Sequence, residues 1–192
     1  SAETNETLQA EAQRISPLLT DYSNDIRLNE ALFKRVEAVY KTRNYLSASP
    51  EQHTLLEKTY KSFSRNGANL SLNDKEHLRR IDKELARLKL KFSENVLAET
   101  QHYQWVITHK EELSGLPDFV LEMLATEAKK HHKEGWVITL DLPVYTAVMK
   151  YANNRELRRK LFIDYHSRCA GDSAYNNEAN VLRIAELRAQ RA

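Results

Sequence analysis

The sequence predicts a mainly α-helical chain, a bundle-like lobe with a small two-stranded β insert. Only four Gly and four Pro occur in 192 residues, and turns and strands use these residues heavily. Apolar residues recur at intervals of three and four along several long stretches, as on one face of a helix. One region, at about 103–142, is instead rich in the aromatic and β-branched residues that favour strands. We expect a single helical domain over 1–192.

The composition indicates a folded chain without a strong electrostatic field. Hydrophobic residues make up 41% and charged residues 29%, and 29 Lys and Arg stand against 27 Asp and Glu. A formal charge of +2 gives no net attraction to nucleic acid or anionic lipid, so we expect neither partner. The single Cys169 favours a reducing compartment, and we expect a cytoplasmic location. A periplasmic one stays open because a signal peptide removed before residue 1 would leave no trace.

The first two predicted helices are amphipathic. Between residues 6 and 28 the apolar residues have roughly helical spacing, with Pro17 as a kink or break; they are Leu8, Ala12, Ile15, Leu19 and Ile26. Asn29 can cap a second helix. Its predicted apolar stripe is Leu32, Val36 and Val39, with Phe33 and Tyr40 beside it.

Two further helices have clear starts. Ser49-Pro50-Glu51-Gln52 has an N-cap Ser, a Pro at the first helical position and a Gln able to complete a capping box. This helix should end near Arg65, with Gly67 in the left-handed turn beyond it. The longest helix should run from Leu72 to about Gln101. Its predicted core stripe is spaced three, four, three and four residues apart: Leu78, Ile81, Leu85, Leu88 and Phe92. The run is too short for a free-standing coiled-coil dimer.

The β insert rests on a repeated tetrapeptide. Trp105-Val106-Ile107-Thr108 and Trp136-Val137-Ile138-Thr139 are identical and have strand character. Between them, Ser114-Gly115-Leu116-Pro117 predicts a turn, and Pro117 should start a helix. A connection of this length permits parallel or antiparallel pairing, and both stay open.

Three helices should complete the chain. The first starts at Pro143, the second is capped at Asn153-Asn154 and runs to about Cys169, and the last begins near Asn177. The last one reaches Ala192 without Gly, Pro or another closing signal. We therefore expect the chain to be cut from a longer protein.

Catalytic constellations are hard to find in this sequence. None of the seven His residues is followed by Glu, so the His-Glu-x-x-His zinc motif is absent. In His131-His132-Lys133-Glu134, an inverted zinc motif would need His where Gly135 stands. His166 and Cys169 are three residues apart and can touch on a helix, but nothing nearby predicts an activated thiol. We expect no catalytic or metal-binding residue in this chain, and the sequence singles out no substrate-binding residue.

Several segments, taken together, resemble the thimet oligopeptidase family of zinc metallopeptidases. The resemblance covers the chain from about Ile26 onward, and no segment of it is a catalytic signature. The segments are 65–71 (RNGANLS), 91–98 (KFSENVLA), 112–117 (ELSGLP), 136–145 (WVITLDLPVY), 148–158 (VMKYANNRELR) and 187–192 (LRAQRA). Within the family, the first and last of these are most similar to bacterial peptidyl-dipeptidases, with oligopeptidase A somewhat further.

The resemblance implies a non-catalytic helical piece of a larger all-helical, zincin-type peptidase that hydrolyses short peptides. In the family, zinc is held by two His of His-Glu-x-x-His and a later Glu, so the catalytic zinc domain would lie beyond residue 192. The present region would wall a deep channel over the zinc and limit peptide size. Apolar surface made for that domain would be exposed here, so we expect the isolated chain to self-associate.

Two other classes of function stay open. One is a helical module that binds a specific protein. The other is a nucleic-acid binder that uses the basic clusters Lys129–Lys133 and Arg155–Lys160. Glu127, Glu134 and Asp164 are interleaved with these cations, which favours salt-bridged solvent faces instead.

Overall fold

The computed structural model describes residues 4–192 and is 72% helical, which confirms the predicted mainly α fold. Contacts divide the chain into two compact units, residues 1–90 with 183–192 and residues 91–182. No helix of the described part is long and apolar enough to cross a membrane. The helices are α1 (Glu6–Arg27), α2 (Glu30–Lys41), α3 (Pro50–Arg65), α4 (Leu72–His102), α5 (Asp118–Lys130), α6 (Leu142–Tyr151), α7 (Arg155–His166) and α8 (Glu178–Arg191).

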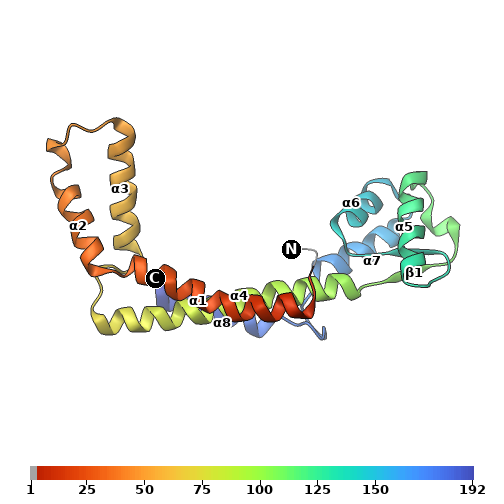
Figure 1. The fold of residues 1–192 in the computed structure, drawn as a ribbon. Coiled ribbons are helices and arrows are strands. Elements are labelled where there is room, and N and C mark those ends of the chain that lie inside the picture. The colour runs from red at the N-terminus through yellow and green to blue at the C-terminus, as the bar shows by residue number, and fades with distance from the viewer. Residues whose placement is uncertain (1–3) are drawn as a thin grey trace. The chain divides into compact units, whose positions relative to one another are not determined.

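In the first unit, α2 and α3 form a helical hairpin (Figure 1), joined through the 3-10 turn η1 (Arg43–Tyr45). Both predicted caps are present: Asn29 accepts from the amide of Leu32, and Ser49 and Gln52 form the capping box. The predicted stripe of α2 is wrong. Phe33 is buried and packs with Tyr60 and Phe63, whereas Leu32 and Val39 are exposed. Aromatic rings bury more area here than the aliphatic residues would.

The core of the first unit includes the first part of α4 and the end of α8. Ile81, Leu85 and Leu187 form a buried cluster, and two ion pairs, Arg183–Glu84 and Arg191–Asp82, flank it. The expected α4 stripe is confirmed at Leu78, Ile81 and Leu85, which are all buried. It is wrong at Phe92, which is 39% exposed.

Gly67 takes the predicted left-handed conformation, with φ of 92°. A Cβ atom there would lie 2.7 Å from Leu78 Cδ2 and 2.9 Å from Leu70 Cδ1. The left-handed backbone therefore favours glycine here, and a Cβ atom would also have to displace the ends of two leucine side chains.

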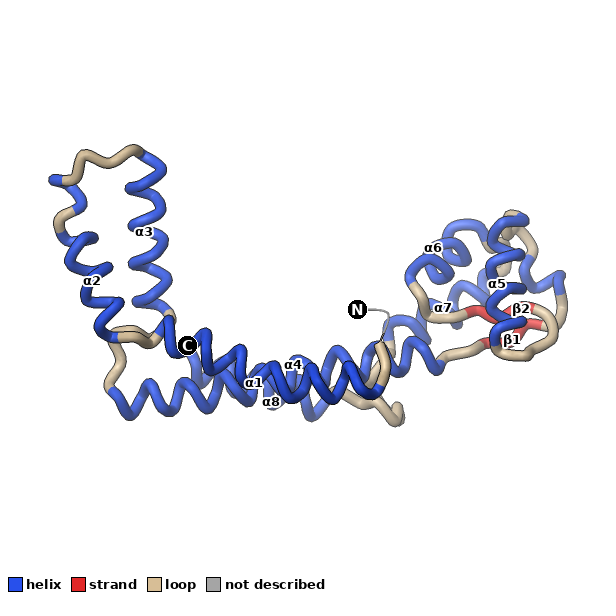
Figure 2. The backbone as a smooth tube through the Cα atoms, viewed as in Figure 1, coloured by secondary structure: helices blue, strands red, loops and turns tan. Residues whose placement is uncertain are grey.

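The second unit contains the β insert and its own core. Strands β1 (Trp105–Ile107) and β2 (Trp136–Ile138) pair antiparallel, with Val106 opposite Val137, so the predicted strands are confirmed and their direction is now settled. Helix α5 packs on β2 (Figure 2). The turn η2 (Lys110–Leu113) precedes α5. The core gathers apolar residues from the strands and α5–α7, among them Val120, Leu124, Ile138, Val148 and Leu161.

Two boundary predictions differ from the structure. Helix α1 continues through Pro17, so the predicted break is absent and the alternative of a kink stays a prediction; a proline removes one backbone hydrogen bond but keeps a helical φ. Helix α7 ends at His166 and not at about Cys169. Cys169 itself has φ of 59°, which no α-helix can accommodate.

Candidate functional site

The second unit has a groove of about 480 Å³ along its stretch of α4. The loop between α7 and α8 and the first turn of α8 form its other sides. Phe92, Val181 and Leu182 give it an apolar character, and all three are exposed. The complete lining is Phe92, Arg168, Cys169, Ala170, Asn177, Glu178, Val181 and Leu182. A mainly apolar groove with a few polar groups is the usual form of a binding site for an extended or small ligand.

Glu99 on α4 fixes the loop that borders this groove. Its Oε2 atom accepts hydrogen bonds from the Cys169 amide and from Ser173 Oγ, the latter at 2.8 Å. One residue further along α4, Thr100 Oγ1 accepts from Arg168 Nη1 at 2.8 Å. These bonds compensate the left-handed backbone at Cys169, which costs free energy in a residue other than glycine.

Asn177 closes the same loop from the α8 side. Its amide donates to the Cys169 carbonyl at 2.7 Å, and its side-chain Nδ2 donates to the Phe92 carbonyl at 3.2 Å. Its Oδ1 accepts from Asn95 Nδ2 at 2.9 Å. Asn177 is buried, so these bonds satisfy groups that have no access to water. The walls of the groove are therefore held in place by polar side chains.

His166 and Cys169 do not form a nucleophile site, as expected from the sequence. Burial, followed by the hydrogen bond and negative charge of Glu99, raises the pKa of the Cys169 thiol to about 11. A nucleophilic cysteine needs the opposite shift. His166 is exposed at the end of α7, where it packs on Phe162 and lies 3.3 Å from Tyr145 Oη through Nε2. Cys169 is a buried structural thiol.

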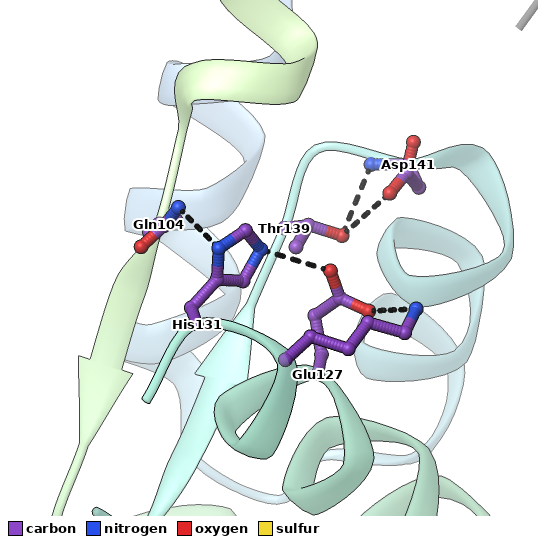
Figure 3. A network of polar contacts seen from close by, with 6 residues as sticks. Gln104, Glu127, His131, Thr139 and Asp141 are labelled. Carbon is purple, nitrogen blue, oxygen red and sulfur yellow. Dashed lines mark hydrogen bonds and ion pairs between the residues drawn. The ribbon is translucent and has the colours of Figure 1, made fainter. Parts of the chain in front are cut away.

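His131, directly after α5, belongs to a polar network (Figure 3). His131 Nε2 lies 3.1 Å from Glu127 Oε1, and Gln104 Nε2 lies 2.9 Å from His131 Nδ1. Since the amide nitrogen of Gln104 can only donate, His131 Nδ1 accepts this hydrogen bond. Lys130, first of all, and then His131 hold the pKa of Glu127 below its usual value. The network ties the end of α5 to the start of β1, a structural role.

Three cations of the basic clusters, Lys130, Arg158 and Lys160, have partners within the fold. Lys130 pairs with Glu127 and Lys160 pairs with Asp164. Lys160 Nζ also lies 4.6 Å from the centre of the Trp105 ring, and Arg158 donates to the carbonyls of Ala152 and Asn153. These ion pairs neutralise part of the positive charge that a nucleic acid would contact.

No group of three or more His, Cys, Asp or Glu side chains within residues 4–192 is arranged to hold a metal ion. The residues present therefore do not fit the zinc site that the resemblance implies for the larger protein.

A second cavity, which sequence reasoning missed, lies in the first unit beside Gly67 and measures about 540 Å³. It is polar: Arg65, Asp74, His77 and Arg191 line it. Arg191 is held by Asp82 at 2.8 Å and by Asn66 Oδ1 at 3.2 Å. Its walls come from three separate segments, so no local pattern in the sequence could reveal it.

Comparisons with known proteins confirm the resemblance, although no family model matches the chain. It is 31% identical over 96% of its length to a probable cytosolic oligopeptidase A of Arabidopsis thaliana, covering 27% of that protein. It is 31% identical over 100% of its length to the dipeptidyl carboxypeptidase of Escherichia coli, covering 28%. Oligopeptidase A of E. coli is 26% identical over 88% of the chain, covering 25%. The chain thus spans about a quarter of the length of these relatives.

Proposed function

We propose, from the premise that the chain is related to oligopeptidase A and dipeptidyl carboxypeptidase, that it is a helical region of a zinc-dependent peptidase acting on short peptides. The observation that carries this is the similarity along 96% and 100% of the chain to two peptidases with different names. A stretch shared by both belongs to what these enzymes have in common, and the names of both refer to short peptides or dipeptides.

Within that peptidase, we propose that this region takes no direct part in the reaction. Two observations support this. The Cys169 thiol is protonated at neutral pH because its pKa is raised to about 11, and His131 is committed to Gln104 and Glu127. The zinc, which supplies a Lewis acid and an activated water when bound, would be held by residues elsewhere in the polypeptide.

The remaining role is steric. A wall of rigid helices beside the zinc would admit flexible peptides and exclude folded proteins. The groove lined by Phe92 and Leu182 has walls of this rigid kind, because hydrogen bonds of Glu99 and Asn177 hold them in place. The two competing classes have less support. The paired Lys130 and Lys160 argue against a nucleic-acid surface, and a separate interaction module would not explain the similarity to peptidases along the whole chain.

Peptide cleavage by the full-length protein tests the proposal. The full open reading frame that contains this chain should give an enzyme that cleaves short unstructured peptides and is inactivated by a chelator. It should leave folded proteins intact, because a channel imposes a size limit that an open cleft does not. A full-length product without peptidase activity would refute the peptidase assignment, and equal cleavage of folded proteins would refute the channel wall.

A further inference from the structure

Helix α1 has its apolar side toward solvent. Six apolar side chains with exposed fractions between 39% and 67% occur along it, namely Leu8, Ile15, Leu18, Leu19, Tyr22 and Ile26. Five of them are separated along the sequence by seven, four, three and four residues: Leu8, Ile15, Leu19, Tyr22 and Ile26. We call Leu8, Ile15, Leu19, Tyr22 and Ile26 the α1 stripe.

The side of α1 that faces the protein is polar. Asn24 lies nine residues after Ile15 in the sequence, about two and a half turns, so it is on the opposite side of the helix. Asn24 is buried, and its Nδ2 atom has no hydrogen-bond partner within residues 4–192. Asp21 and Asp25 pair with Lys83 and Arg79 of α4 at 2.8 and 2.7 Å. Two ion pairs therefore join α1 to α4, and the ribbons of the two helices run alongside each other (Figure 1).

An amphipathic helix gains most of its stability by burying its apolar side. Here that side is left in water, while a buried amide goes unpaired, and both features are unfavourable. An exposed apolar stripe of this kind is typical of a surface that another element covers.

We infer that the α1 stripe is the seat of an apolar helix from the part of the same polypeptide outside residues 1–192. The inference rests on the proposed function. The alternation of three and four residues along one side of α1 suits packing against a second helix, and the described part of the chain is itself mainly helical, so we take the occupant to be a helix. The relatives are about four times as long as this chain, which covers 27% and 28% of two of them. Most of their chain is therefore available to supply it.

A second copy of the chain is the weaker occupant. The stripe runs from residue 8 to residue 26, fewer than the three to four heptads that a free-standing helix pair needs. A helix in the same polypeptide has a far higher effective concentration and needs no such length. In the isolated chain, where that helix is missing, the same stripe would cause weak association.

Oxidative footprinting of Tyr22 tests the inference. Tyr22 is 67% exposed in this chain, and hydroxyl radicals modify exposed tyrosines without any mutation. Its rate of modification is measured in the isolated chain and in the full-length protein. In the full-length protein we expect a roughly ten-fold slower rate, as for a residue that enters the core of an interface. An equal rate in both would overturn the inference.

Two matched variants of the full-length protein test whether the α1 stripe is responsible for the protection of Tyr22. Leu19→Lys, in the stripe, should restore fast modification of Tyr22, whereas Arg14→Lys, exposed and outside the stripe, should leave it slow. Protection that disappears on dilution, together with a dimer that dissociates, would assign the stripe to a second copy and contradict the inference. The readout does not depend on peptide cleavage, so a full-length protein without activity refutes the proposed function without deciding the footprint.

Discussion

Glu99 and Cys169 are 70 residues apart in the sequence, and the amide of Cys169 donates a hydrogen bond to Glu99 Oε2. The same oxygen accepts from Ser173 Oγ at 2.8 Å. One carboxylate thus holds both ends of the loop segment that borders the apolar groove of the second unit.

Replacing Glu99 with Ala should lower the free energy of unfolding by about 1–3 kcal/mol, because it leaves two donors without their acceptor. Glu99→Gln, which keeps one acceptor oxygen, should cost less. Urea unfolding measures both. Glu122→Ala, an exposed carboxylate on α5, is the control and should change stability by about 0.5 kcal/mol or less. Equal losses at Glu99 and Glu122 would mean that the loop is not held by this bond.

The Cys169 thiol should react slowly with thiol reagents in the folded protein. With its pKa raised to about 11, only about one thiol in 10,000 is ionised at pH 7, and the thiolate is the reactive form. Labelling should become fast on unfolding in urea. Fast labelling of the native protein would contradict the burial and the pKa shift.

The same shift predicts a pH dependence of stability. The folded state holds the thiol proton more tightly than the unfolded chain, whose cysteine titrates near pH 8.5. The contribution is therefore complete below that pH and is lost as the pH rises through about 11. The difference in unfolding free energy between the wild type and Cys169→Ala should shrink over this range. A difference that grows with pH would show the opposite sign of shift.

The hairpin of α2 and α3 should depend on its aromatic contacts. Tyr40 and Tyr60 stack with their centroids 4.0 Å apart and 4° between the planes, and Phe33 adds a second ring to Tyr60. Tyr60→Ala should cost about 1–3 kcal/mol of stability, as for other well-packed aromatic clusters. Leu55→Ala, in the same helix but exposed, should cost little. Thermal or urea unfolding, followed by near-ultraviolet circular dichroism, measures the stability of both variants. A larger loss of stability for Leu55→Ala than for Tyr60→Ala would mean that α3 does not pack through its Tyr60 side.

Leu85 and Phe92 of α4 should respond differently to truncation. Leu85 is buried and Phe92 is 39% exposed. Leu85→Ala should therefore cost about 2–5 kcal/mol, and Phe92→Ala clearly less. The free energy of unfolding is measured for both variants. Equal losses would mean that Phe92 is packed as tightly as Leu85, as the predicted continuous stripe of α4 requires.

The contrast between Leu85 and Phe92 shows which features the sequence can predict and which it cannot. Caps and turns depend on a few neighbouring residues, so Asn29, Ser49 with Gln52, and Gly67 could all be predicted. The strand character of the Trp-Val-Ile repeats is equally local. The side on which a helix packs depends on distant partners. Phe33 faces inward because Tyr60 meets it from α3, and nothing in the sequence around Phe33 contains that information.

The candidate groove illustrates the same limit. Its residues come from α4, the loop after α7 and the start of α8, and the bonds that fix it join residues 70 and 85 positions apart. The sequence could identify Cys169 as a small thiol to be packed, but it could not show that Glu99 lies against it. Only the resemblance to peptidases, which uses the whole chain at once, gives information on this scale.

The zinc content of two proteins, each purified without a metal-binding tag, tests the central claim most directly. The isolated chain of residues 1–192 should contain no stoichiometric zinc, since residues 4–192 have no group of ligands arranged for it. The product of the full open reading frame should contain one tightly bound zinc per chain, the number needed for an activated water. One tightly held zinc in the isolated chain, or none in the full-length protein, would contradict the assignment of this chain as a non-catalytic region of a zinc peptidase.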